Sequence, residues 1–216
     1  MNYRTLLGSV IVLLFSTLAF AQDAVTADTS FQVRFASNLN IGDSVTNVTN
    51  TGAISTNAFP IQNGNLCLNV YTFSTDEQLI SCCSCLVTPD GLVSLSARGD
   101  LIINTLTPAV PNAIVIKLLA TAGTTAATCN AATAGSGDNA LATGLAAWGT
   151  TIHTLPITPG TPATTYGLTE TAFEPATLSV SELTRITSLC GFIQIIGGGF
   201  GICNACRGGG QGAVAK

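Results

Sequence analysis

The chain has 216 residues, of which 8% are charged, with seven basic residues, eleven acidic residues and one histidine. Soluble domains typically carry roughly 25% charged residues, so neutral polar and small side chains must cover most of the surface. So few basic residues form no patch that follows a phosphate backbone, which excludes nucleic acid as an expected partner. Few groups remain for acid–base catalysis, so we expect that the protein is not an enzyme.

The first 21 residues have the organisation of a cleavable signal peptide. Arg4 precedes an apolar stretch from Leu6 to Phe20, and Ala19-Phe20-Ala21 matches the small-x-small site of signal peptidase. The apolar stretch is shorter than the roughly 20 residues that span a bilayer. We therefore expect cleavage, export to the extracellular space or the cell surface, and no stable membrane span.

The mature chain, residues 22–216, is expected to form a single disulfide-stabilised, β-rich domain. Residues 22–30 are expected to be a flexible N-terminal arm, and residues 207–216 a flexible tail. Removal of the signal takes Arg4 away and leaves six basic and eleven acidic side chains. Such a low charge gives little repulsion between copies, so the expected partner is a second copy of the chain.

Short strands separated by turns make up the first two thirds of the mature chain. Alternating apolar and polar residues indicate strands, and Pro89-Asp90-Gly91 indicates a turn. The stretch 74–77 predicts the turn of a hairpin. The predicted strands are residues 31–36, 44–49, 66–73, 78–88, 92–97, 112–120 and 148–155, with an extended run at 100–104.

Residues 121–139 and 156–167 are predicted to be loops. Ser179 and Glu182 have the capping-box spacing that begins a helix. Apolar residues then recur at helical spacing up to the glycines at 197–199. The whole pattern predicts a mainly β fold, an antiparallel β-sandwich or jelly-roll-like domain with one C-terminal α-helix. The apolar face of that helix is expected to be Leu183, Ile186, Cys190 and Ile193.

Eight cysteines, an even number in an exported chain, predict up to four disulfides. They allow about 105 connectivities, so the pairing stays open. The predicted hairpin places Cys67 opposite the 82–85 cluster, and a bond through Cys129 would tie down the long loop. A bond from Cys190 to Cys203 or Cys206 would pin the tail to the helix. The candidates are Cys67, Cys82, Cys83, Cys85, Cys129, Cys190, Cys203 and Cys206.

The cluster at 82–85 must reach two different partners, because neighbouring residues of a strand point to opposite faces. Cys83 and Cys85 share one face and Cys82 takes the other. Metal binding by these thiolates is the alternative. The chain has one CxxC and one CCxC rather than two well-spaced CxxC pairs, and an oxidising compartment opposes free thiolates. We therefore expect no metal and no cofactor.

Redox catalysis by Cys203 and Cys206 is a further alternative. It requires a helix N-terminus to lower the thiol pKa, whereas glycines follow Arg207, so a structural disulfide is favoured. His153 has no nucleophile or acid beside it in the sequence that would complete a catalytic set. No catalytic residue is predicted, and a secreted hydrolase is the least favoured class.

Two groups of motifs resemble a family of secreted, cysteine-rich bacterial proteins for which no activity is established. The first group is the CCxC motif with the preceding 66–73 run and the following 88–92 turn, and the second is the 147–150 run with the C-terminal GICxxC motif. The resemblance covers roughly residues 64–206. It implies export and a shared cysteine framework, and it carries over no catalytic residue.

Two function classes follow from these patterns. The first is a secreted structural or cell-surface protein, a self-associating subunit of an extracellular filament or layer, in which exposed strand edges pair between copies. The second is an extracellular binding module or adhesin for carbohydrate or another surface ligand. Its stacking residues would be Trp148, Tyr71 and Tyr166 if they are exposed, whereas the competing interpretation is that they pack in the core.

Overall fold

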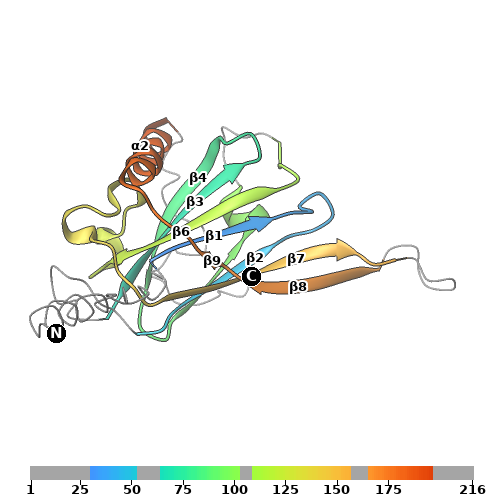
Figure 1. Cartoon of the computed structure of the whole chain (residues 1–216), viewed down its shortest axis with the longest axis horizontal. Helices are drawn as coiled ribbons and strands as arrows, with labels where there is room; N and C mark the ends of the chain where they lie inside the picture. The colour runs from blue at the N-terminus through green and yellow to red at the C-terminus, as the bar shows by residue number, and fades with distance from the viewer. Residues whose placement is uncertain (1–29, 53–63, 103–108, 157–164, 197–216) are drawn as a thin grey trace, which may run out of the picture.

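Two antiparallel sheets face each other, and one helix lies against the outer side of the first sheet (Figure 1). The computed structural model describes residues 30–52, 64–102, 109–156 and 165–196. The predicted fold class, mainly antiparallel β with one C-terminal helix, is confirmed. The elements are β1 (Phe31–Ala36), β2 (Val45–Asn50), β3 (Leu66–Ser74), β4 (Leu79–Val87), β5 (Leu92–Ser96), η1 (Ala97–Leu101), β6 (Ile114–Ala122), η2 (Ala126–Thr128), η3 (Ala131–Thr133), η4 (Gly137–Asn139), β7 (Leu145–Thr154), β8 (Tyr166–Ala172), β9 (Glu174–Pro175) and α2 (Val180–Ile196).

Sheet A has the strand order β4-β3-β6-β1-β9, and sheet B has the order β5-β2-β7-β8. The chain passes from sheet B to sheet A at Phe173. The Phe173 N–H donates to the carbonyl of Ala147 at 2.9 Å, and the next residue, Glu174, already pairs with Val33 of β1. The sandwich is therefore joined by continuous chain on the side of β8 and β9.

The predicted hairpin is confirmed as β3 and β4. Ser74 donates a hydrogen bond to the Asp76 carboxylate in the turn, which lowers the pKa of that carboxyl. The register differs from the expectation for Cys67, which lies opposite Leu86, while Cys85 lies opposite Leu68. Two features near the turn cause this shift: Phe73 pairs with Leu79, so the turn is one residue longer than predicted, and the pairing is irregular between Thr72 and Phe73.

Strands β3 and β4 of sheet A are buried on both faces. Every residue of β3 except Ser74 is buried, because sheet B covers one face and α2 with η3 covers the other. Antiparallel sheets more commonly leave one face to water. The outer core contains Phe31, Tyr71, Phe73, Cys82, Leu119, Ala131, Ala134, Ile186, Cys190 and Ile193. The core between the sheets includes Leu66, Leu68, Val70, Cys83, Cys85, Leu95, Leu101, Ile116, Leu118 and Ala147.

The alternation along β1 is confirmed, but its polar face is buried. Phe31 and Val33 face α2, whereas Gln32 and Arg34 point between the sheets. Gln32 donates to the carbonyl of Leu145 at 2.8 Å. Since buried polar groups are costly unless they are hydrogen-bonded, these side chains link the two sheets instead of facing water.

The predicted extended run at 100–104 is wrong over its described residues, because η1 is a helical turn. Asp100 accepts a hydrogen bond from the Ser96 N–H at 2.7 Å, and the Ser96 hydroxyl accepts one from the Gly99 N–H at 2.7 Å. Short polar side chains bond to nearby backbone groups and compete with the strand ladder. Residues 103–104 lie outside the described residues.

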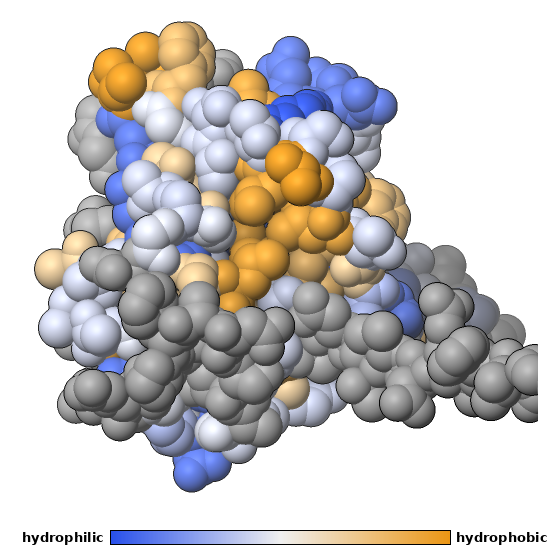
Figure 2. Space-filling model, turned by 60° about the vertical axis from the view of Figure 1, so that its left-hand side comes forward, coloured by the Kyte–Doolittle hydropathy of each residue, from blue (hydrophilic) through white to orange (hydrophobic). Residues whose placement is uncertain are grey.

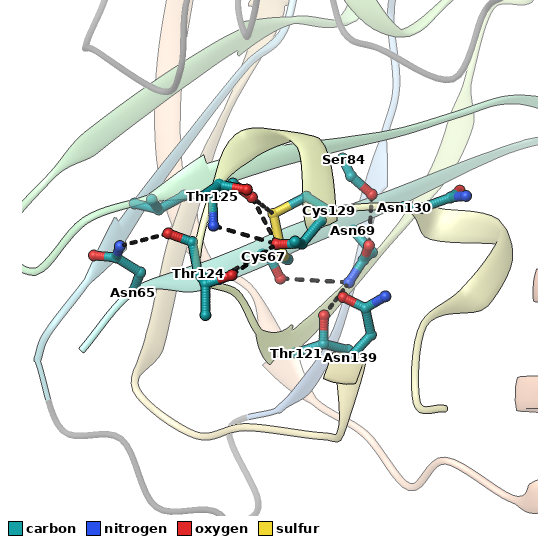
Figure 3. The surroundings of a disulfide bond; sticks show 12 residues. Asn65, Cys67, Asn69, Ser84, Thr121, Thr124, Thr125, Cys129, Asn130 and Asn139 are labelled. Carbon is teal, nitrogen blue, oxygen red and sulfur yellow. Dashed lines mark hydrogen bonds between the residues drawn. A yellow bond between two sulfur atoms is a disulfide. The ribbon is translucent and has the colours of Figure 1, made fainter. Parts of the chain in front are cut away.

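The predicted loop at 121–139 begins after β6, which continues to Ala122. Three single helical turns, η2 to η4, follow in its place. A disulfide between Cys129 and Cys67 of β3 attaches this segment to sheet A, as expected (Figure 3). A Cβ atom at Gly123 would clash with the Cys67 sulfur, so only glycine fits beside this bond.

The prediction that Ser179 caps the start of α2 is confirmed. The Ser179 hydroxyl accepts a hydrogen bond from the Glu182 N–H at 3.1 Å. Ile186, Cys190 and Ile193 are buried against sheet A. Lys117 of β6 forms an ion pair with Glu182 and so fixes the first turn of the helix. Within the described part of the chain, no helix has the length and apolar character to cross a membrane.

A substitution of Tyr71 tests the packing of the outer core. The ring of Tyr71 is fully buried, and its hydroxyl donates to the Ala131 carbonyl at 2.6 Å. Tyr71→Phe should lower the free energy of unfolding by about 1–2 kcal/mol, since it leaves a buried carbonyl without its donor. Urea unfolding measures this change. Tyr166→Phe is the matched control, because Tyr166 is half-exposed, and it should change stability by less than about 0.5 kcal/mol. Equal effects at both positions would contradict the assignment.

Candidate functional site

The cysteines form structural bonds rather than a reactive centre in the described residues. Cys82 is bonded to Cys190 and Cys67 to Cys129, and no described cysteine is free. The expected bond from Cys190 to the tail is wrong, because the buried face of α2 lies directly on Cys82. The cysteines Cys203 and Cys206 lie outside the described residues.

The same part of the chain was expected to hold no metal site, and its acidic residues, histidine and cysteines can be compared directly with that expectation. No group of three or more His, Cys, Asp or Glu side chains among the described residues has the geometry to hold a metal ion. The ion pairs within this part join Glu182 to Lys117 and to Arg185. Neither involves His153, which lies on β7 opposite Gly167 of β8.

The outer face of sheet B has no described helix or sheet packed against it. Side chains of β7 alternate in burial, with Ala147 and Gly149 pointing inward and Trp148 pointing outward. On β8, six of the seven residues are exposed. We call this surface the outer face, and it includes Asn47, Ser94, Trp148, Tyr166, Leu168 and Glu170.

Trp148 lies in a row of side chains that crosses the sheet. Asn47 lies opposite Trp148 on β2, and Ser94 lies opposite Asn47 on β5. The Ser94 hydroxyl donates to the Asn47 side-chain oxygen at 2.7 Å, and the Asn47 amide donates to Glu170 Oε1 at 3.3 Å. The indole, 40% exposed, is therefore flanked by a fixed chain of hydrogen-bonding groups.

The other two candidate stacking residues behave differently from each other. Tyr71 is buried in the outer core and cannot stack on a ligand. Its burial raises the pKa of its hydroxyl. Tyr166 is 46% exposed on the outer face. It lies opposite Thr154, six residues along β7 from Trp148, which corresponds to about 20 Å. Trp148 and Tyr166 therefore share a face but do not form one stacking platform.

Strand β8 ends sheet B, and no described strand pairs with its far side. Phe173 and Leu155 donate backbone hydrogen bonds to Ala147 and Thr165, which identifies the hydrogen-bonded pairs of the hairpin. In an antiparallel ladder, the intervening residues direct their N–H and C=O groups away from the partner strand. The outward-directed backbone groups belong to Tyr166, Leu168, Glu170 and Ala172.

The sequence analysis missed β8. It placed residues 156–167 in a loop, of which 157–164 lie outside the described residues, and it assigned no strand to 168–172. The segment Tyr166–Ala172 contains one Tyr and two Thr, residue types that favour strands. Its exposure on both faces removes the apolar alternation that would have revealed it.

Arg34 anchors the β7–β8 hairpin from the interior. It is 7% exposed and donates to the hydroxyls of Thr151 at 2.7 Å and Thr171 at 3.3 Å. No ion pair among the described residues includes Arg34, and burial lowers the pKa of its guanidinium. Its guanidinium packs against Gly149, where a Cβ atom would lie 2.5 Å from Cζ.

Comparison with known proteins gives no family for the chain: no family model, curated protein or solved structure matches it.

Gly149→Ala tests the anchoring role of Arg34. The added methyl group would displace a buried guanidinium from its hydroxyl partners, so we expect a loss of about 1–3 kcal/mol in unfolding free energy. Thermal or urea unfolding measures it. Gly191→Ala in α2 is the matched control, because its Cβ would meet Ala132 at an ordinary 3.8 Å. Alanine favours the helix, so this control should gain up to about 1 kcal/mol. A neutral Gly149→Ala would contradict the packing.

Proposed function

We propose that the protein is an exported structural or cell-surface subunit that associates with further copies through the free edge of β8. The observation that carries this proposal is the row of outward-directed backbone groups along that strand. Unpaired strand edges accept further strands through main-chain hydrogen bonds. The disulfides in the fold are compatible with an extracellular protein.

The β8 edge lacks the usual protection against pairing. Edge strands are commonly blunted by Pro, Lys or a short length. Strand β8 has seven residues with neither Pro nor Lys, and its one charged residue is Glu170. Leu168, at the centre of the strand, is 69% exposed. A chain with 8% charged residues adds little repulsion between copies.

The shape of the β7–β8 hairpin also favours association. In Figure 1 the two strands extend beyond the body of the sandwich, so this part of β8 lies away from sheet A. Arg34 holds the base of this hairpin from inside. A preorganised edge loses less conformational entropy on pairing than a mobile segment does.

Leu168→Pro is the sharpest test of edge pairing. It removes an outward N–H while leaving the bonds between β8 and β7 intact, because Leu168 lies in a non-hydrogen-bonded pair with Ile152. We expect the wild-type mature protein to form concentration-dependent oligomers. The variant should need at least about 30-fold more protein to assemble, from a loss of about 2 kcal/mol per contact. Light scattering and electron microscopy measure assembly.

Leu168→Thr is the matched control, since it removes the apolar side chain but keeps the N–H and the strand propensity. It should assemble much like the wild type, and both variants should keep the wild-type melting temperature within a few degrees. Monomeric wild-type protein at all concentrations, or normal assembly of Leu168→Pro, would refute the proposal.

A second candidate function, carbohydrate binding, rests on the row around Trp148. An exposed indole offers an apolar ring to the C–H face of a sugar, and fixed polar neighbours bind its hydroxyl groups. Asn47, Ser94 and Glu170 supply these polar neighbours. Sugar binding would use side chains of the outer face, whereas strand pairing would use backbone groups of β8, so the two functions are compatible.

Trp148→Ala should reduce binding to insoluble chitin, cellulose or peptidoglycan by at least about tenfold, because stacking contributes about 1.5 kcal/mol. Sedimentation of protein with each polysaccharide measures binding. Phe35→Ala, which removes a 57% exposed ring from β1, is the matched control and should bind normally. Absence of binding by the wild type, or equal loss in both variants, would remove this candidate.

A further inference from the structure

Cys83 and Cys85 of β4 are buried between the sheets, and both are disulfide-bonded. The other described cysteines cannot be their partners, because Cys82 is bonded to Cys190 and Cys67 to Cys129. The partners of Cys83 and Cys85 must therefore be found among the cysteines that remain in the sequence.

Cys83 and Cys85 do not bond to each other. They are two residues apart on one face of an extended strand, opposite Val70 and Leu68 respectively. Their Cβ atoms point the same way and are separated by about 6.6 Å. A disulfide requires Cβ atoms about 3.5–4.5 Å apart.

The sequence contains two further cysteines, Cys203 and Cys206. We propose that Cys83 and Cys85 are joined to Cys203 and Cys206, so that two disulfides fasten the C-terminal segment onto the inner face of β4. The occupant of this part of the sandwich is then the chain's own C-terminal segment. Each bond forms from two thiols that lose two protons and two electrons to a thiol oxidant of the export compartment.

The spacing of the two pairs is compatible. The Cα atoms of Cys83 and Cys85 are about 7 Å apart in an extended strand. Cys203 and Cys206 are three residues apart, so their Cα atoms can be separated by up to about 10 Å. Both bonds can therefore form side by side without stretching the segment.

The segment between α2 and Cys203 is long enough to reach the inner face of β4. Helix α2 ends at Ile196, seven residues before Cys203, which allows a span of roughly 23 Å. Cys82 attaches α2 to the outer face of the same strand, and β4 is the edge of sheet A. A route from α2 to the inner face of β4 would therefore pass around the edge of β4, where no described strand lies in the way. Three glycines at 197–199 permit the tight bend that this route needs.

The surface next to this route is apolar. The last turns of α2 expose Phe192, Ile195 and Ile196, with Ile195 83% exposed. Figure 2 shows apolar residues gathered in a continuous area near the centre of the view. On the inner side, the Ser81 hydroxyl donates to the Leu101 carbonyl, so η1 covers the end of the same face of β4 that carries Cys83 and Cys85. The C-terminal segment would cover the rest.

Attachment of the C-terminal segment to β4 would also affect the edge of sheet A. A segment fastened to β4 would shield that edge from other strands, whereas no described strand shields β8. This consequence is separate from the disulfide pairing itself, which holds whether or not copies associate.

Peptide mapping of the exported, unreduced protein tests the pairing. Trypsin with chymotrypsin can release a fragment of residues 201–207, which contains Cys203 and Cys206 but not Cys190, and a fragment of residues 80–86 with the three β4 cysteines. We expect the two fragments to remain linked until a reductant is added. Recovery of the 201–207 fragment alone with an internal Cys203–Cys206 bond, with free thiols, or linked to a second chain would overturn the proposal.

A pair of double variants gives an independent measurement. In Cys203→Ala with Cys206→Ala, the denatured, unreduced protein should react with two equivalents of a thiol reagent, and mass spectrometry should locate both at Cys83 and Cys85. Cys82→Ala with Cys190→Ala is the matched control. It should show no free thiol and should keep the 201–207 fragment linked to β4. Unreactive Cys83 and Cys85 in the first variant would contradict the pairing.

Discussion

The burial of β3 and β4 on both of their faces is the constraint on which the rest of the structure depends. Strands β3 and β4 carry apolar side chains in both directions, so one layer of neighbours is not enough. Sheet B covers the inner face, while α2 and the segment after β6 cover the outer one. The Cys82–Cys190 and Cys67–Cys129 bonds fix this outer layer in place. Such cross-links restrict the unfolded chain, which favours the layered state.

Sheet B carries no comparable layer of described chain on its outer side, and this difference locates the candidate functions. Trp148 and its hydrogen-bonded neighbours lie on a face that nothing in the described residues covers, and Leu168 lies on an edge strand beside it. Because the chain is poor in charge, this surface relies on amides and hydroxyls for its polarity. Buried Arg34 donates to the β7–β8 hairpin from the opposite side of the sheet. Its charged group therefore fixes the position of this hairpin but is not part of the outer face.

The alternation of side chains was the most informative local pattern. It correctly placed Cys82 on one face of β4 and Cys83 with Cys85 on the other. The same alternation identified β1 but did not show that Gln32 and Arg34 face the interior. Alternation of side chains assigns the residues of a strand to two faces. It does not indicate which of the two faces other layers of the fold will cover. For the same reason Tyr71 and Trp148 were equal candidates in the sequence and differ fully in burial.

The sequence by itself determined the β-rich class, most of the strands, the turn at Pro89-Asp90-Gly91 and the capped helix, because these depend on residues within a few positions of each other. Only the tertiary structure decided that Cys190 bonds to Cys82, 108 residues away, and that β8 ends sheet B with no described strand on its far side. Contacts across such distances depend on how whole layers pack. Local propensity and spacing carry no information about that packing, so the open face and edge became visible only after the sheets were assembled.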